Sequence, residues 1–499
     1  MTGAGMAGEA GMAGHTGTAG DAAAADGAAA AGSAGAGAAR RGERSAAVVQ
    51  YALLAGPLLS MIDSSIVNVA AAPIARELHA SLATVQWTVS GYLLALGTGL
   101  AGTAYLARRY GTVRVYRVSL AAFTAASALC ALAPGIGALI AFRAVQGLVA
   151  APLVPLAMSM LLGKGGQARS ISVAAGIMLF AAPALGPTVG GALIGAGGWR
   201  LIFAVNVPFG VFAVRAAKRL RRESAGTVRE KEDFDFPGLL LLGAGVTLVL
   251  LGTSQGGTDG WGSAACLAPL MAGVVLLAAY WRWAASRPRP ALDLSLLREA
   301  TPALSMGLCA LAAVVTWTAV FLLPVFVQTV QGRSALAAGI AMAPQGIVTG
   351  LSTAVGQRGL LRRFTVRATV CAGFGCLGVA SLLLLTVGAA TPLWLIAVIL
   401  AVRSASIGLV ITPLLTALTG PLPPERMGDA STLFNVVERI AGSFGIGLLA
   451  SLYGTVARSP AGPVDALHVT GIVIASIAAA GAALALFLPS VRNTTLLAD

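Results

Sequence analysis

Charged residues are scarce in this 499-residue sequence: 10% of its residues are charged, whereas 57% are hydrophobic and the mean hydropathy is +0.84. A soluble protein carries about 25% charged residues, because charge keeps its surface in water. The deficit excludes an ordinary soluble globular chain. It predicts instead a protein whose outer surface faces lipid.

Histidine and cysteine are also scarce, which leaves little material for a metal centre. Of the three histidines only His468 falls within a long apolar stretch, at its very edge, and the five cysteines lie within such stretches without the spacing of metal ligands. No pairing of a nucleophile with a base and no phosphate-binding loop is present either. The sequence therefore predicts no enzyme activity, no metal and no cofactor.

Apolar stretches of about 20 residues, the length that crosses a ~30 Å hydrocarbon core as a helix, are abundant. Hydropathy and helix-breaking residues predict an all-α polytopic membrane protein with fourteen spans. The spans are 47–73, 85–106, 114–133, 136–161, 170–196, 200–217, 237–254, 264–284, 303–326, 335–356, 367–388, 391–416, 429–455 and 467–489.

The net charge of +14 is compatible with a nucleic acid partner, but the positions of the basic residues exclude one. Cytoplasmic loops of membrane proteins hold an excess of Lys and Arg. With the amino terminus inside, few basic residues fall elsewhere. The exceptions are Arg76, Arg200, Arg333 and Arg458 in outside loops, and Arg143, Arg403 and Arg439 within spans. A missed span would invert every later loop, so the asymmetry predicts an even number of spans with both termini cytoplasmic.

Two basic loops resemble each other, LARRYGTVR at 106–114 and LLRRFTVR at 360–367. If spans seven and eight are an insertion, each loop follows the second helix of a six-helix set, as in a transporter built from two parallel halves. Chance similarity of two Arg-rich turns is the alternative. The predicted domains are a disordered Gly/Ala-rich cytoplasmic tail (1–45), an N-terminal six-helix bundle (46–222), an inserted helix pair with linkers (223–300), a C-terminal six-helix bundle (301–490) and a cytoplasmic tail (491–499).

Only two of the 19 acidic residues, Asp63 and Glu438, fall well inside predicted spans. A charge at mid-membrane costs about 2.5–3.5 kcal/mol on insertion scales, so each is a functional candidate that needs a partner. Asp63 in span one and Arg143 in span four lie about 15 and 12 Å from the outer ends of their helices. The two can face each other, and such a carboxyl group can load and release a proton. The alternative is a permanent ion pair that only fixes the two helices.

Glu438 lies about 14 Å from the inner end of span thirteen, next to Arg439. Adjacent helical residues diverge by about 100°, so these two cannot pair face to face. Arg403 lies at similar depth in span twelve and is a candidate partner for Glu438. Trp317, in mid-span, either stacks on an aromatic or cationic ligand or packs in the core.

Span five contains the stretch GPTVGG at 186–191, preceded by a further proline. Proline interrupts the backbone ladder of a helix, and glycine lets a neighbouring helix approach closely. The pattern predicts a kinked, sliding helix contact formed by Pro183, Gly186, Pro187, Gly190 and Gly191.

Together these patterns resemble the major facilitator superfamily, in particular its fourteen-span drug:proton antiporter branch. The similar stretches are MIDSSIVNVA at 61–70, RAVQG at 143–147, GPTVGG at 186–191, WRLIFAVNVPFG at 199–210 and DFPG at 235–238. The resemblance covers essentially everything after residue 45. It implies the major facilitator fold, proton coupling through Asp63 and Arg143, and supporting positions in a central cavity for Asn68 and Gln146.

One loop departs from that family pattern. The loop after span two normally reads Gly-x-Leu-Ala-Asp-Arg-x-Gly; here Arg108 replaces the acid, and Arg109, Gly111 and Arg114 complete a basic turn. Arg362 replaces the acid in the second half as well. The cytoplasmic charge network that the resemblance implies therefore needs other partners, either phospholipid headgroups or the acids within 230–235.

The resulting hypothesis is a proton-coupled multidrug or antibiotic efflux transporter that works by alternating access in the bacterial cytoplasmic membrane. Its expected partners are a small hydrophobic or cationic substrate, protons and membrane lipid, and the expected state is a monomer. Asp63, Arg143 and Glu438 are the candidates for proton or substrate binding, with Trp317, Arg403 and Arg439 in the supporting cavity. The alternatives are a proton symporter or facilitator of a small metabolite, and a membrane receptor or scaffold that does not transport.

Overall fold

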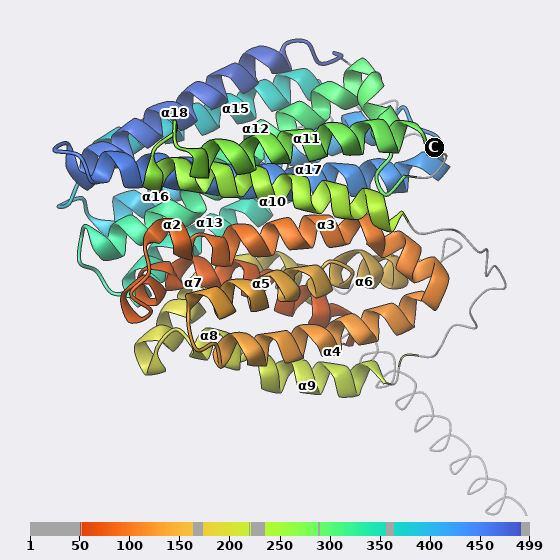
Figure 1. Cartoon of the computed structure of the whole chain (residues 1–499), viewed down its shortest axis with the longest axis horizontal. Coiled ribbons are helices and arrows are strands. Elements are labelled where there is room, and N and C mark those ends of the chain that lie inside the picture. Colours follow the sequence, from red (N-terminus) through yellow and green to blue (C-terminus); the bar gives the residue numbers. More distant parts are fainter. Residues whose placement is uncertain are drawn as a thin grey trace, which may run out of the picture. The chain divides into compact units, whose positions relative to one another are not determined.

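The computed structural model of the chain describes residues 50, 52–162, 173–218, 220, 235–287, 290–355 and 364–490. Within these ranges the architecture is all-α (Figure 1). Twelve helices are long and apolar enough to cross a membrane, and a thirteenth span results if the bent pair Leu185–Gly197 and Leu201–Ala217 is counted as one. Helices occupy all fourteen predicted stretches. The predicted tails, 1–45 and 491–499, lie outside the described residues.

The helices that correspond to the first six predicted spans run from residue 52 to residue 217. They are the first helix (Ala52–Glu77), α2 (Leu82–Val85), α3 (Trp87–Tyr110), α4 (Thr112–Ala131), α5 (Ile136–Ala150), α6 (Leu153–Leu162), α7 (Val173–Gly197), α8 (Leu201–Ala204) and α9 (Asn206–Ala217).

The remaining helices follow after residue 235. They are α10 (Phe236–Asp259), α11 (Ala264–Ala285), the 3-10 helix η1 (Leu294–Arg298), α12 (Ala300–Thr329), α13 (Ala335–Val355), α15 (Val366–Leu382), the 3-10 helix η3 (Leu383–Thr386), α16 (Leu393–Thr419), α17 (Pro424–Ala457) and α18 (Gly462–Ala485).

Local sequence explains where several helices begin and end. Gly111 lies between α3 and α4 at φ +86°, a conformation that glycine adopts at little cost, and it turns the chain there. Ser263 caps α11 and Thr365 caps α15, because each hydroxyl accepts a hydrogen bond from a backbone N–H of the first turn. Pro324 inside α12 and Pro413 inside α16 are compatible with membrane helices, where neighbouring groups satisfy the freed carbonyls.

The predicted fifth and sixth spans meet at a sharp turn. The axes of the two helical segments on either side of residues 198–200 differ by 119°. Gly198 adopts φ +85° at this turn. Trp199 next to it is fully buried and packs edge-on against Phe203, with ring centroids 6.2 Å apart. The turn is therefore anchored by an aromatic pair.

Helices far apart in the sequence lie side by side. α3 packs against α17, α7 packs against α13, and α10 contacts both α3 and α17. Figure 1 shows α10 and α11 as a neighbouring pair, with α10 lying between α3 and α17. The helix pair between residues 236 and 285 thus lies along the line where α3 and α17 meet.

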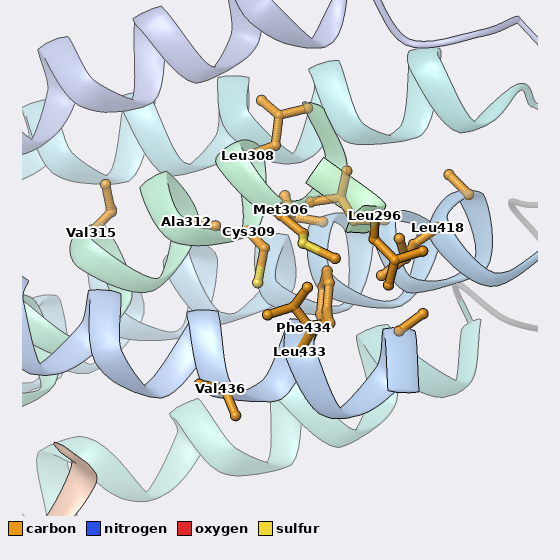
Figure 2. Packing of buried hydrophobic residues seen from close by; sticks show 14 of the residues in the cluster. Leu296, Met306, Leu308, Cys309, Ala312, Val315, Leu418, Leu433, Phe434 and Val436 are labelled. Atoms are coloured by element: carbon orange, nitrogen blue, oxygen red, sulfur yellow. The ribbon is translucent and has the colours of Figure 1, made fainter. Parts of the chain in front are cut away.

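A hydrophobic core joins α12, α16 and α17 (Figure 2). Met306 and Cys309 of α12 pack near Leu433 and Phe434 of α17, all of them at most 2% exposed. Many large apolar side chains elsewhere are exposed, as expected where the solvent is lipid rather than water. Buried polar side chains against this apolar background are therefore the features that mark a site.

Candidate functional site

Asp63 of the first helix and Arg143 of α5 form an ion pair inside the helix bundle. Asp63 Oδ2 accepts a hydrogen bond from Arg143 Nη1 at 2.5 Å, and neither side chain is exposed. The two residues that lie at similar depth in the sequence-based spans are thus in direct contact. Their charges compensate each other in an interior where an isolated charge is costly.

The second carboxylate oxygen of Asp63 accepts hydrogen bonds from two side-chain amides. Gln146 Nε2 donates to Asp63 Oδ1 at 3.1 Å, and Asn206 Nδ2 of α9 donates at 2.8 Å. Gln146 also accepts from Arg143 Nη1 at 2.7 Å and donates to Ser127 Oγ of α4 at 2.7 Å. Three helices therefore meet at one carboxylate, which three side-chain donors satisfy within the protein, and α4 joins the network through Gln146.

Arg143 is held by more than its ion pair. Its Nε donates to the carbonyl of Thr88 on α3 at 2.9 Å, and its guanidinium carbon lies 4.1 Å from the ring centroid of Tyr92. Phe203 contributes a second ring at 5.6 Å. Arg143 Nη2 is buried and has no acceptor among the described residues. The donors of Arg143 in this network therefore outnumber the acceptors that it contacts by one nitrogen.

A second buried arginine lies in the helices that follow the inserted pair. Arg403 of α16 is 1% exposed, and it donates from Nη1 to the carbonyl of Thr316 on α12 at 3.0 Å and from Nη2 to Gln345 Oε1 on α13 at 3.1 Å. The expected pair with Glu438 is wrong: among the described residues no carboxylate lies within 4.0 Å of Arg403. Its guanidinium contacts α12 and α13 instead, while Glu438 is half-buried on α17.

Arg439 lies beside this cluster. Its guanidinium carbon is 5.3 Å from the ring centroid of Trp317, and its buried Nε has no acceptor among the described residues. Trp317 is only half-buried and packs closely over Gly442 of α17. The predicted residues Trp317, Arg403 and Arg439 therefore gather around one stretch of α12.

The glycines of α7 lie in close helix contacts. A Cβ at Gly186 would meet Ser65, and one at Gly190 would meet Ile66 Cγ1 at 2.5 Å, so this face contacts the first helix. Gly191 faces α13, where a Cβ would lie 2.5 Å from the carbonyl oxygen of Ala335. α7 thus contacts two helices at backbone distance, as its glycines allow. Pro187 lies in the same contact, against Gly339 of α13, and the side chain of Pro183 lies outside the described set.

Comparison with known proteins identifies the family. The family model described as Major Facilitator Superfamily matches residues 53–446. The chain belongs to the major facilitator superfamily. The match runs from the first helix into α17, so it includes the Asp63 network, the Arg403 cluster and the glycines of α7.

The curated relatives within the superfamily include exporters. A multidrug resistance protein B homolog of Mycobacterium tuberculosis (strain H37Rv) is 32% identical over 79% of this chain and 74% of its own. The multidrug export protein EmrB of Escherichia coli (strain K12) is 30% identical over 81% and 80% of the two chains. The cephamycin export protein CmcT of Amycolatopsis lactamdurans is 33% identical over 80% and 83%.

Solved structures share the superfamily architecture. An auto-inhibited peptide transporter of the POT family aligns with a TM-score of 0.64 over 89% of this chain and 98% of its own, at 15% sequence identity. This similarity shows the fold. The chain is accordingly a multi-pass membrane protein of a family of transporters.

The basic loop that departs from the superfamily pattern is exposed. Arg108 and Arg109 end α3 and Arg114 begins α4, with Gly111 between them. The second copy, 360–363, lies outside the described residues, as do 230–234 of the expected acidic partners. Asp235 caps α10 instead. Its carboxylate accepts from Gly238 N at 3.0 Å, Trp283 Nε1 at 2.7 Å and Ala291 N at 3.0 Å.

A surface ion cluster outside the spans links η1 to the start of α17. Arg426 Nη2 lies 3.3 Å from Asp293 Oδ2 and donates to Ser295 Oγ at 2.9 Å, and Nη1 lies 3.5 Å from Glu299 Oε1. Partial burial raises the pKa of Asp293, but hydrogen bonds from Ser295 and Arg426 outweigh it and lower the pKa below the ordinary 3.8.

Sequence reasoning missed several residues of the two buried clusters. Asn206 donates to Asp63, and Gln345 accepts from Arg403. Both are amides within apolar stretches. A polar side chain in an apolar span is the signal that singled out Asp63, and the same criterion applied to Asn and Gln would have found Asn206 and Gln345. Thr88 and Thr316 contribute backbone carbonyls, which no side-chain pattern reveals.

Proposed function

We propose that this transporter exports hydrophobic drugs or antibiotics from a bacterial cell in exchange for protons. The observation that carries the proposal is the buried Asp63–Arg143 ion pair, with the amides of Gln146 and Asn206 on the same carboxylate. An ionisable group inside a membrane protein is costly and marks an ion or substrate pathway by default. The names of three relatives, two for multidrug resistance or export and one for cephamycin export, support the direction and the class of substrate.

Asp63 is the proposed proton site. Protonation removes the charge that compensates Arg143 and turns one acceptor oxygen into a donor. A neutral acid therefore cannot satisfy the donors of Arg143, Gln146 and Asn206 as the carboxylate does. Because the ion pair joins the first helix to α5, proton loading favours a different packing of these helices.

We place the proton cycle within alternating access of two six-helix bundles, 46–222 and 301–490, with residues 223–300 as an inserted pair. Contacts between the bundles support a closed outer side: Gln328 Nε2 donates to the Val69 carbonyl at 2.9 Å, and Thr188 Oγ1 donates to the Gly339 carbonyl at 3.1 Å. Gln328 and Gly339 lie near helix ends that the Lys and Arg distribution assigns to the outside, and Val69 and Thr188 lie in the outer halves of their helices. Opening to the outside requires these contacts to separate.

The remaining predicted residues have supporting roles in this scheme. Gly186, Gly190 and Gly191 let α7 slide against its two neighbours, with Pro183 and Pro187 bending its path. Asn68 lies five residues after Asp63 on the first helix and is fully buried, and its Oδ1 has no partner among the described residues. Glu438, half-buried on α17, is a further candidate for proton or substrate binding. The chain works as a monomer in the cytoplasmic membrane with both termini inside, and its basic loops contact anionic lipid headgroups.

The test is a resistance profile of a drug-sensitive bacterial host that expresses the chain, with and without a proton uncoupler. We expect lower accumulation of, and higher resistance to, a subset of hydrophobic compounds, both abolished by the uncoupler. Resistance that survives the uncoupler contradicts proton coupling. Uptake of a polar metabolite without drug efflux would favour a symporter, and transport of no tested solute in proteoliposomes would favour a receptor or scaffold.

A further inference from the structure

Arg403 is a buried cation without a counter-ion. It is 1% exposed, its two contacts are neutral oxygens of Thr316 and Gln345, and its Nε has no acceptor among the described residues. Arg143 provides the internal comparison, because it is equally buried and is paired with Asp63. Among the residues that the structure describes, two arginines are thus buried, one compensated by a carboxylate and one not.

The charge balance inside the spans points the same way. Three arginines, Arg143, Arg403 and Arg439, lie well inside the predicted spans, but only two acids, Asp63 and Glu438, do so. Asp63 is paired with Arg143, and Glu438 is not an ion-pair partner of either other arginine among the described residues. An unpaired buried charge is strongly unfavourable, so its presence calls for a partner that arrives from outside the chain.

The surroundings of Arg403 fit an anionic group. Gln345 Oε1 lies 3.1 Å from Arg403 Nη2, where a carboxylate oxygen would make a stronger, charge-assisted bond. Gln345 is only half-buried, so its neutral oxygen is a group that a ligand can displace. The planar guanidinium offers Nε and Nη2 as two parallel donors, which matches the two oxygens of a carboxylate.

A second guanidinium and an aromatic ring adjoin this position. Arg403 contacts the carbonyl of Thr316, and the next residue, Trp317, has the Arg439 guanidinium 5.3 Å from its ring centroid. Arg439 Nε is also buried without an acceptor among the described residues. The half-buried indole supplies an apolar surface beside the Arg439 guanidinium, one residue along α12 from the carbonyl that Arg403 contacts.

We propose that Arg403, with Gln345 and Arg439, binds the carboxylate of an amphipathic anionic substrate whose apolar body lies against Trp317. The inference rests on the proposed export function and narrows its substrate class, from hydrophobic drugs or antibiotics in general to those that carry a negative group, which replaces the cationic class expected from the sequence. It also assigns the two ligands to separate sites: the Asp63 network binds the proton, and the Arg403 cluster binds the substrate anion.

The experiment measures binding of three probes to the full-length chain purified in detergent, by equilibrium dialysis. The probes 1-naphthylacetate, 1-naphthylacetamide and 1-naphthylmethylammonium share one ring system and differ in charge. We expect the acetate to bind at least tenfold more tightly than the other two. Equal affinity for the acetate and the neutral acetamide overturns the proposal.

Two substitutions locate the site. Arg403→Gln should weaken binding of the acetate at least tenfold and leave the acetamide unchanged, and Arg403→Lys should give an intermediate loss because it keeps the charge without the fork. The matched control is Arg282→Gln, which removes one positive charge from an exposed position on α11. An equal loss for both probes in Arg403→Gln, or an equal effect of Arg282→Gln, contradicts the assignment.

Gln345→Glu separates binding from folding. A carboxylate at this position compensates Arg403 internally, so the variant should unfold at a higher temperature than the wild type and yet lose selective binding of the acetate. Unchanged acetate binding in a variant with raised thermal stability refutes the site. Drug efflux in cells is scored separately: efflux without anion selectivity overturns this inference alone, whereas anion selectivity without efflux overturns the proposed function alone.

Discussion

Asp63→Asn is the substitution that tests the buried network most directly. Asp63 takes three side-chain hydrogen bonds on two oxygens, whereas Asn offers one acceptor oxygen and turns an N–H₂ group toward other donors. It also leaves Arg143 buried without compensation. Removing one partner of a buried ion pair costs about 3–5 kcal/mol, which is a roughly 10²- to 10⁴-fold change in the ratio of folded to unfolded protein. We expect this loss in thermal or denaturant unfolding of the purified chain.

The double variant Asp63→Asn with Arg143→Gln distinguishes stability from coupling. Removing both charges together is nearly neutral in many proteins, so the double variant should recover most of the stability. It should not recover efflux against a gradient in vesicles driven by a pH difference, because the proton site is gone. Uphill efflux by the double variant with unchanged pH dependence would refute the assignment of Asp63 as the proton site.

The exposed pair Glu77–Arg200 supplies the matched control for these variants. Its side chains are 49% and 39% exposed. Glu77→Gln also removes a carboxylate from an arginine, but water solvates the partner that remains, so the expected loss is below about 1 kcal/mol. An equal loss in Glu77→Gln and Asp63→Asn would show that burial of the Asp63 pair does not carry the effect.

Three further predictions concern other parts of the chain. Gly191→Ala should destabilise the chain by about 1–3 kcal/mol and slow transport, because the added Cβ meets backbone atoms of α13. The control is Gly195→Ala on the same helix. Its Cβ faces open space, so this variant should be neutral or slightly stabilising in unfolding measurements. Asp235→Ala removes the cap of α10 and should cost about 1–2 kcal/mol, with faster hydrogen exchange confined to the start of α10 and its contact with α11. Because the folded pKa of Asp293 is lowered, its contribution to stability is present above pH 3.8 and is lost as the pH falls through the folded pKa. Arg426→Gln should bring that pKa closer to 3.8 in an NMR titration. Since the cluster is partly exposed, the same substitution should change stability by well under about 1 kcal/mol.

The fold followed from the sequence because length and hydropathy act on each helix separately. Helices lie in every predicted span, although spans four and six each consist of two helices and, among the described residues, spans five and six qualify as membrane-spanning only together, as one bent pair. The contact between Asp63 and Arg143 was also predictable, since one acid and one arginine lie at similar depth in the first six spans. Because the first six spans contain only one deeply placed acid and one deeply placed arginine, their similar depth was enough to predict that they pair.

Similar depth wrongly predicted an ion pair between Glu438 and Arg403, because depth specifies the position along the membrane normal but not the direction in which a side chain points. That direction depends on how α16 packs against its neighbours, and Arg403 contacts α12 and α13. Such packing is a long-range property of the whole bundle. The close contacts of the α7 glycines were predicted as a type of contact, whereas their partners, the first helix on one face and α13 on the other, required the structure.

The inserted pair limits how the two proposed bundles can move. α10 is tied to the first bundle by hydrogen bonds, because Gln86 Nε2 and Trp87 Nε1 both donate to Ser254 Oγ at 3.3 Å. Its contact with α17 in the second bundle passes over Gly447, where a Cβ would lie 3.3 Å from Leu250 Cδ2 and 3.9 Å from Thr253 Oγ1. Directional hydrogen bonds resist sliding more than apolar contacts with a glycine do. When the bundles rock, α10 should therefore move with α3 and slide along α17, so that the inserted pair belongs mechanically to the half that contains the proton site.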